Sequence, residues 1–521
     1  MINLKEAYAH SEERIRLIFF VMIAALVFAM LGTVFFSSTT VLVVLVGALF
    51  VWLTFEYPLW GLLFLAAFLP FEPFLLKWVP DELYLYARLF SELIVYLLFG
   101  ITAVRHFLQE KRFPWTPITF PFLLFLVALF ASSVVNFVEP TQALIGVRQI
   151  IRFVLVFFTV VLLQPSRHMI RLFTSVLFVV VCIQASIGIM QAVVGEPLDV
   201  FLLPSESRSH GELTLTEGTV QFWDPGSRVF ATLGRYDRLG TFIAFFLLLG
   251  VGFLYEKRVL SERRWLWPLF VLGLPALALT FSRSSWFGFL FGFLFLAFII
   301  KRDKRVMWGS LITTVLLGLY LAYSGIVVSR LIDVPGQTFA ERFFEAFSYE
   351  RWRGEYYGLG RLFWIVQTVT NVLPASPLFG WGPGQYGGGA ALLFHNTRVF
   401  DELGLPYGVY GTEGYIDNNW LSILGETGLI GFSFFVWTYL ALFAYAIRLG
   451  KRSSYAFDRA LGFGFAAAMI AVALNAFLAT FFEVRSLAVY LWMYGGFVVV
   501  LGHDEMPNDE FRISKKSTTN I

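Results

Sequence analysis

Arginine is the residue type whose positions in this sequence first suggest chemistry. Arginines recur where strongly apolar stretches end and in two long stretches rich in glycine, proline and polar residues. These arginines are Arg148, Arg152, Arg228, Arg235, Arg238, Arg283, Arg342, Arg351, Arg353, Arg361 and Arg485. The planar guanidinium group binds phosphate through two parallel hydrogen bonds. A single arginine of this kind could instead reach to lipid headgroups or pair with a nearby glutamate. The whole set favours a site for an anionic ligand.

The sequence patterns of other common sites are missing. There is no Gly-x-x-x-x-Gly-Lys-Ser/Thr loop for nucleotide phosphates, no His-Glu-x-x-His and no Cys/His set for zinc. Of the 6 histidines, only His210 and His395 fall in the two long polar stretches. The single cysteine, Cys182, lies in an apolar run, where core packing is its expected role. We therefore expect no metal site and no cofactor.

Composition determines the class of protein. The chain has 521 residues, of which 58% are hydrophobic and 14% charged, with a mean hydropathy of +0.72. Soluble domains carry about 25% charged residues. Such a composition excludes a soluble enzyme, a disordered chain and a disulfide scaffold, because so much apolar surface cannot be hidden from water. The net charge of +3 gives no indication of nucleic-acid binding.

The apolar stretches predict an all-α integral membrane protein. A helix needs about 20 apolar residues to cross a hydrocarbon core of about 30 Å, and about fourteen stretches meet this requirement. They are residues 17–36, 39–55, 58–79, 84–104, 116–137, 145–164, 172–195, 239–255, 265–281, 285–300, 306–328, 428–448, 458–481 and 487–503.

Basic clusters predict the orientation of these spans. Short basic loops stay on the cytoplasmic side, and two spans separate each cluster from the next. The clusters are residues 105–112, 167–171, 257–264, 301–305, 448–452 and 512–516. Both termini are then cytoplasmic, and two long loops, 196–238 and 329–417, lie outside, the second with short interfacial helices. We expect one membrane domain over 1–503 and a cytoplasmic tail over 504–521. Nucleotide-activated sugars are not available outside the membrane. An anionic substrate bound there is therefore expected to be a lipid-linked phosphate or diphosphate.

Three passages resemble the O-antigen ligase and polymerase superfamily of bacterial membrane glycosyltransferases. The first is Arg228-Val-Phe-Ala-Thr-Leu-Gly234, in which Ala231 stands where the family usually has glycine. The second runs from Gly360-Arg361 to the turn Ser376-Pro-Leu-Phe-Gly-Trp-Gly-Pro-Gly384. The third is Asp417-Asn-Asn-Trp-Leu421 followed by Glu426-Thr-Gly-Leu-Ile-Gly431. Arg283 also matches the Ser-Arg pair that the family carries at the outer end of a helix.

The third passage differs from the ligase branch of this family. That branch usually has histidine about eleven residues before the first glycine of the Gly-x-x-Gly pair, followed by Asn, Ser or Gln. Here Asp417 and Asn418 occupy these positions. The difference favours a repeat-unit polymerase or another exopolysaccharide enzyme. The pair His395-Asn396 lies in the same loop without the glycine spacing and is a possible substitute.

The resemblance implies transfer of a glycan from undecaprenyl diphosphate to a sugar hydroxyl, without metal or nucleotide. The leaving diphosphate needs cations, for which Arg283 and Arg361 are the catalytic candidates. The attacking hydroxyl needs a general base, for which Asp417 is the candidate, with Glu413 and Glu426 behind it. Asp417-Asn418 could instead cap the following helix. The predicted substrate-binding residues are Arg228, Arg238, Glu413, Asn418, Tyr386 and His395; the ring of Tyr386 could stack on a sugar or anchor at the membrane interface.

The expected partners are an undecaprenyl-diphosphate-linked oligosaccharide, a glycan acceptor, the lipid bilayer and other polysaccharide-assembly proteins. The expected location is the inner membrane of a bacterium, with the active site on its outer face. Two alternatives stay open. One is an O-antigen ligase that transfers the glycan to lipid A–core. The other is a flippase of lipid-linked oligosaccharide, which should carry more charges along its spans than this sequence does.

Overall fold

The computed structural model of the chain describes residues 37–109, 113–204, 208–210, 213–216, 228–256, 266–332, 334, 337–411 and 416–505. Nearly all the regular structure in these residues is helical. The N-terminal helices are α2 (Ser38–Glu56), α3 (Pro58–Phe68), α4 (Glu72–Leu75), η1 (Leu76–Trp78), α5 (Asp81–Leu108), α6 (Thr119–Val135), α7 (Pro140–Ile151), α8 (Val154–Leu163) and α9 (Arg167–Val194).

The first predicted outer loop contains a short helix and an antiparallel hairpin, in which Ser209 pairs with Thr214. Its elements are α10 (Glu196–Leu202), β1 (Arg208–His210) and β2 (Leu213–Thr216). Four apolar helices follow it and end at the second predicted outer loop. They are α11 (Tyr236–Tyr255), α12 (Trp267–Leu279), α13 (Arg283–Leu294), which continues into the π-helix η4 (Phe295–Ile300), and α14 (Lys304–Val328).

The described residues of the second predicted outer loop fold into short helices. They are α15 (Phe339–Phe344), η5 (Glu345–Phe347), α16 (Tyr349–Tyr357), α17 (Arg361–Gln367), η6 (Thr368–Val372), α18 (Leu373–Ala375), α19 (Gly388–Leu393), α20 (Arg398–Leu403) and η7 (Val409–Gly411). Three long helices complete the described chain: α21 (Asn419–Arg452), α22 (Ala456–Ala476) and α23 (Arg485–Glu505).

Within the described residues, 8 helices are long and apolar enough to cross a membrane, or up to 10 if each of two bent pairs is one span. The pairs are α3 with α4–η1 and α7 with α8. Three further apolar helices, α2, α6 and α12, are shorter. Every predicted span from 39–55 onward coincides with one of these helices or pairs. The predicted span 17–36 lies outside the described residues, and the structure does not confirm the count of fourteen.

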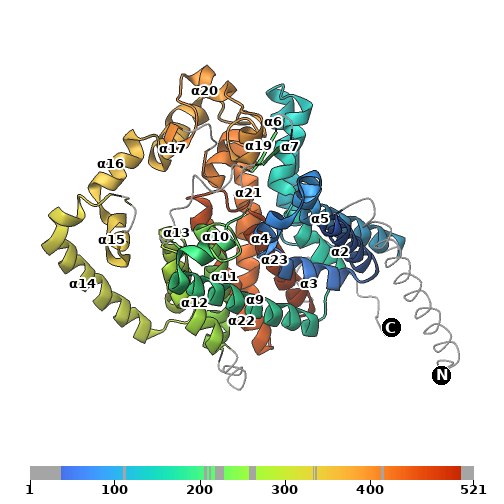
Figure 1. The fold of residues 1–521 in the computed structure, drawn as a ribbon, viewed down its shortest axis with the longest axis horizontal. Coiled ribbons are helices and arrows are strands. Elements are labelled where there is room, and N and C mark those ends of the chain that lie inside the picture. The colour runs from blue at the N-terminus through green and yellow to red at the C-terminus, as the bar shows by residue number, and fades with distance from the viewer. Residues whose placement is uncertain are drawn as a thin grey trace.

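Helices α11, α22 and α23 form the buried centre, whereas α14, α15 and α16 form an arm that stands away from it (Figure 1). Glycines allow the central helices to approach closely. A Cβ atom at Gly252 on α11 would lie 2.3 Å from the carbonyl oxygen of Ala460 on α22. Small residues at helix contacts are typical of membrane bundles, where packing replaces the hydrophobic effect between helices.

The short helices of the second loop enclose an apolar cluster of their own. Its buried members include Trp364, Val372, Tyr386, Val399 and Phe400. The cluster joins α17, η6 and α20 to the glycine-rich turn. The loop helices therefore have a core that can hold charged side chains in fixed positions at the surface.

Candidate functional site

One buried carboxylate holds three of the predicted phosphate-binding arginines. Glu345 is fully buried. Arg283 Nη1 lies 2.8 Å from Glu345 Oε1, Arg342 Nη1 lies 3.0 Å from Oε2, and Arg351 Nε lies 3.4 Å from Oε1. The three guanidinium groups come from α13, α15 and α16. Their shared carboxylate connects the arm to the first residue of α13, and the ion pairs compensate the cost of burying these charges.

A second carboxylate extends this network toward α17. Arg351 Nη2 also pairs with Glu355. The Glu355 carboxylate accepts hydrogen bonds from the hydroxyl of Tyr410, at 2.8 and 2.9 Å, and from the backbone N–H of Arg361, at 3.1 Å. A continuous chain of polar contacts therefore runs from Arg283 to Arg361.

The chain of contacts ends at Asp417, the predicted base. Arg361 Nη2 lies 2.7 Å from Asp417 Oδ2. The side chains are 33% and 21% exposed, so a ligand can reach both. Burial disfavours the charged guanidinium, but Asp417, with Tyr410 and Glu355, outweighs this effect and raises the pKa of Arg361. Arg361 Nε is buried and has no hydrogen-bond partner among the described residues. Among these residues, one donor of the guanidinium is thus left without an acceptor.

The cap of α21 is Asn418 and not Asp417. Asn418 Oδ1 accepts a hydrogen bond from the backbone N–H of Leu421 at 3.0 Å, and its Nδ2 donates to the carbonyl of Phe477 at 2.7 Å. Both ends of the Asn418 amide are therefore occupied, and the residue is buried. The alternative that the pair Asp417-Asn418 caps this helix therefore holds for Asn418 and not for Asp417. The substrate contact of Asn418 stays a prediction.

The glycine-rich turn of the second passage packs against a break in α21. The helix leaves helical geometry at Gly428, where φ is 63° and ψ is −167°. The turn supplies partners for the interrupted backbone. The N–H of Trp381 donates to the carbonyl of Gly425 at 2.9 Å, and the N–H of Gly382 donates to the carbonyl of Glu426 at 2.9 Å. The second and third passages are thus two sides of one contact.

Glycine is required on both sides of this contact. Gly380 and Gly428 both have positive φ, at 64° and 63°. A Cβ atom at Gly380 would lie 2.5 Å from the carbonyl oxygen of Gly425, and one at Gly428 would lie 2.4 Å from the carbonyl carbon of Leu378. Side chains at these positions would be strained by the backbone and would also clash. The glycines therefore reverse the loop against the helix.

Two carboxylates fix the next segment of the loop. Glu426 Oε1 accepts from the N–H of Gly387 at 3.1 Å. Glu483 Oε2 accepts from the N–H of Gly389 at 3.2 Å, and Glu483 Oε1 accepts from Asn419 Nδ2 at 3.0 Å. Burial raises the pKa of the Glu483 carboxyl. Glu426 is buried and its carboxylate holds the loop backbone, and its role as the alternative base stays a prediction.

Of three other predicted site residues, one is buried in the loop core, one is exposed and one lies outside the described residues. Tyr386 is fully buried, and its hydroxyl lies 2.7 Å from Thr368 Oγ1. The prediction that this ring stacks on a sugar or anchors at the interface is corrected, because the loop core covers it. His395 is exposed on the link between α19 and α20. Glu413 lies outside the described residues.

The first passage borders the turn that carries Arg283. The N–H of Val229 donates to the carbonyl of Leu279 at the end of α12, at 3.3 Å. The guanidinium of Arg228 lies 4.3 Å from the ring centroid of Tyr236. Arg238 lies in the first turn of α11. The substrate contacts of Arg228 and Arg238 stay predictions.

Ala231, which stands where the family usually has glycine, adopts a backbone conformation typical of glycine. Ala231 has φ of 47°, in the left-handed region that favours glycine. The N–H groups of Phe230 and Ala231 donate to Gln191 Oε1 at 3.0 and 2.9 Å. The buried amide of Gln191 therefore holds this conformation, although no pattern in the sequence marks it for that role.

Arg148, Arg152 and Arg485 pair with other carboxylates. Arg148 Nε lies 2.5 Å from Glu92 Oε1, and Arg152 Nη1 lies 3.0 Å from Glu92 Oε2. Arg485 Nη1 lies 2.9 Å from Glu72 Oε1. These contacts join α4, α5, α7 and α23, which lie apart from α15 and α16 (Figure 1). The prediction that the whole set converges on one site is therefore corrected, because this group has its own carboxylates.

Glu345 and Glu355 are the side chains of the candidate site that sequence reasoning missed. The i,i+4 spacing of Arg351 and Glu355 was the available signal, since such pairs meet on a helix surface. No group of three or more acidic, histidine or cysteine side chains that could hold a metal ion occurs in the part of the chain that the structure describes.

Fold and site together define a polytopic helical membrane protein with an arginine–carboxylate site on its loop helices. Residues 268–436 match the family model described as O-antigen ligase. This match confirms the resemblance to the O-antigen ligase and polymerase superfamily, over the segment that contains Arg283, Arg361 and Asp417. None of the curated proteins matches the chain significantly.

Proposed function

We propose that the protein is an O-antigen or exopolysaccharide repeat-unit polymerase. It transfers a glycan from undecaprenyl diphosphate to a sugar hydroxyl at the outer face of the bacterial inner membrane. The contact between Arg361 and Asp417 carries this proposal. It brings a cation for a leaving phosphate within 2.7 Å of a carboxylate base, and both side chains are partly exposed.

In the proposed reaction the acceptor hydroxyl oxygen bonds to the anomeric carbon of the donor. The bond from that carbon to the diphosphate oxygen breaks, and its electron pair leaves with the diphosphate. The hydroxyl proton passes to the carboxylate of Asp417. Arg361 stabilises the charge that develops on the leaving group. Binding of the diphosphate to Arg361 competes with Asp417, so the carboxylate becomes a stronger base when the donor is present.

The position of Arg283, the second arginine candidate, supports a role in binding the diphosphate. Arg283 lies at the outer end of α13, where a lipid-linked diphosphate would meet the membrane boundary, and it is 16% exposed. Glu345 fixes its orientation, and Arg351 and Glu355 connect it to Arg361. We assign Arg283 the role of holding the diphosphate before transfer. Arg228, Arg238 and His395 are proposed to contact the glycan or the phosphates.

A ligase is the second candidate, favoured by the description of the matching family model. It would transfer the glycan to lipid A–core. The presence of Asp417 where the ligase branch usually has histidine favours the polymerase. In either case we propose a metal-independent enzyme with about fourteen spans, both termini in the cytoplasm and both long loops outside. Other polysaccharide-assembly proteins are its expected partners.

The test is reconstitution of the purified protein in liposomes with undecaprenyl-diphosphate oligosaccharide as the only glycan. A polymerase lengthens the lipid-linked glycan under these conditions. A ligase gives product only after lipid A–core is added. Absence of product with both substrates would exclude both candidates.

A further inference from the structure

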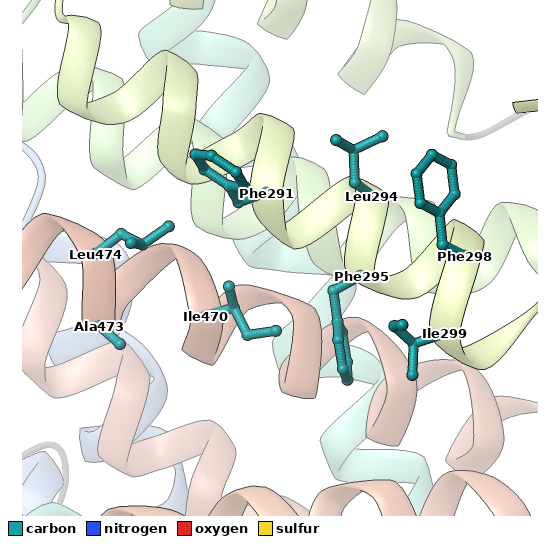
Figure 2. Close-up of a pocket in the computed structure, with 8 residues that line it drawn as sticks. All are labelled: Phe291, Leu294, Phe295, Phe298, Ile299, Ile470, Ala473 and Leu474. Atoms are coloured by element: carbon teal, nitrogen blue, oxygen red, sulfur yellow. The ribbon is translucent and has the colours of Figure 1, made fainter. Parts of the chain in front are cut away.

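An apolar groove lies between α13–η4 and α22. It has a volume of about 550 Å³ and is lined by Phe291, Leu294, Phe295, Phe298, Ile299, Ile470, Ala473 and Leu474. Figure 2 shows the first five residues along α13 and η4 and the other three on the facing turns of α22. All eight side chains are hydrocarbon. The groove therefore suits a hydrocarbon chain and offers no hydrogen bond to a polar ligand.

The groove runs alongside a close contact between the two helices. A Cβ atom at Gly288 would lie 2.8 Å from Asn475 Nδ2, and one at Gly292 would lie 2.6 Å from the carbonyl oxygen of Ala467, on the turns of α22 that also line the groove. Beyond this contact the helix changes to the π-helix η4. A π turn rotates the following side chains relative to an α-helix and is frequent at functional sites.

The neighbouring helix leaves the groove accessible from the bilayer. Helix α14 follows η4, but only 6% of its most apolar stretch is buried. In Figure 1 it runs away from α13 and α22 toward α15 and α16. A lipid chain can therefore enter the groove laterally from the bilayer.

The same helix links the groove to the arginine site. Arg283 is the first residue of α13, and Phe291, the nearest lining residue in sequence, follows eight residues later. At 1.5 Å per residue this is about 12 Å along the helix axis. An amphiphile with its phosphates at Arg283 and its tail directed into the bilayer would reach the groove along one helix.

We propose that this groove binds the polyprenyl tail of the lipid-diphosphate substrate whose headgroup is held at Arg283. This inference rests on the proposed function for the identity of the headgroup. The groove lies on the same helix as Arg283. Among membrane lipids, this position favours one whose headgroup is a diphosphate that Arg283 can bind. A short prenyl chain ends before the groove, so only a long chain gains from it.

The test is binding of two prenyl diphosphates to the full-length protein in nanodiscs of neutral phospholipid. One is undecaprenyl diphosphate and the other is geranyl diphosphate, whose chain is too short to fill the groove. Leu474→Trp fills the groove from α22, and Ala473→Trp does so from the adjacent position. Leu316→Trp on α14, which is 61% exposed, adds the same bulk to a lipid-facing surface elsewhere.

Both groove variants should weaken binding of the long chain by about tenfold, the effect of losing two buried methylene contacts. They should leave binding of the short chain unchanged, and Leu316→Trp should alter neither. Equal affinity of the groove variants and the wild type for the long chain would overturn the inference, as would an equal loss for both chain lengths. Chain-length-dependent binding without glycan transfer would support the groove and reject the proposed enzyme.

Discussion

Arg361 and Asp417 are separated by 56 positions in sequence, yet Nη2 of Arg361 lies 2.7 Å from Oδ2 of Asp417. The contact joins the first residue of α17 to the residue that precedes the cap of α21. Because Asn418 supplies the cap, the Asp417 carboxylate is available for chemistry. The network through Glu355 holds the backbone of Arg361 in place on the other side.

Arg283→Lys should lose most glycan transfer while the protein still inserts and folds. Lysine keeps a positive charge near Glu345, but it lacks the two-pronged geometry that a diphosphate engages. The measurement is transfer in liposomes together with the melting temperature in detergent. Arg353→Lys is the matched control, because this side chain is 55% exposed on the same arm and pairs only at 3.7 Å with Glu350. Near-native turnover of Arg283→Lys would make this residue a headgroup anchor outside the site.

Gly428→Ala should destabilise the protein. Its positive φ costs an L-residue about 1–3 kcal/mol, and the added Cβ would also meet Leu378. The expected result is a clear decrease in melting temperature in detergent. Gly318→Ala on α14 is the control, because no atom lies within 4 Å of its added Cβ. An unchanged melting temperature for Gly428→Ala would mean that the break in α21 does not need glycine.

The orientation can be tested by cysteine labelling after Cys182→Ser. Gly354→Cys on α16 introduces no clash, because no atom lies within 4 Å of the added Cβ. This cysteine should react with an impermeant thiol reagent on intact spheroplasts. A cysteine at Lys451, in a basic cluster at the end of α21, should react only after lysis. The reverse pattern would invert the proposed topology.

Chelators should leave glycan transfer unchanged. The cations of the proposed site are guanidinium groups, and they need no metal ion to stabilise the leaving diphosphate. The measurement is transfer in liposomes with excess EDTA on both sides of the membrane. A loss of activity that Mg²⁺ restores would refute metal independence.

The sequence predicts where the long apolar helices lie, since apolar length determines them, but the structure does not confirm the count of fourteen spans. The sequence also identifies Arg283, Arg361 and Asp417, which the structure joins in one network. It cannot predict Glu345 as the common partner of three arginines, because Arg283 lies far from it in the chain and only the folded arm brings them together. The break at Gly428 is equally hidden, since a glycine in an apolar run is compatible with a continuous helix.

The burial of Tyr386 is another feature that could not be predicted from the sequence. An aromatic residue in a polar loop is compatible with sugar binding, with the membrane interface and with a core. The choice depends on whether the loop builds its own apolar cluster, and here Phe400 and Trp364 complete one around it. That cluster depends on contacts between segments about which hydrophobic periodicity carries no information.

The central claim is that Asp417 accepts the proton of the acceptor hydroxyl. The most direct measurement is the rate of glycan transfer from undecaprenyl-diphosphate oligosaccharide by Asp417→Asn in liposomes, compared with wild type. Asp401→Asn changes an exposed side chain on helix α20 of the same loop; it is the control and should transfer at the native rate. Asparagine cannot act as a base, so the rate of Asp417→Asn should fall at least about a hundredfold, with the melting temperature within a few degrees because the Asn418 cap is intact. Transfer by Asp417→Asn at the native rate would contradict the account.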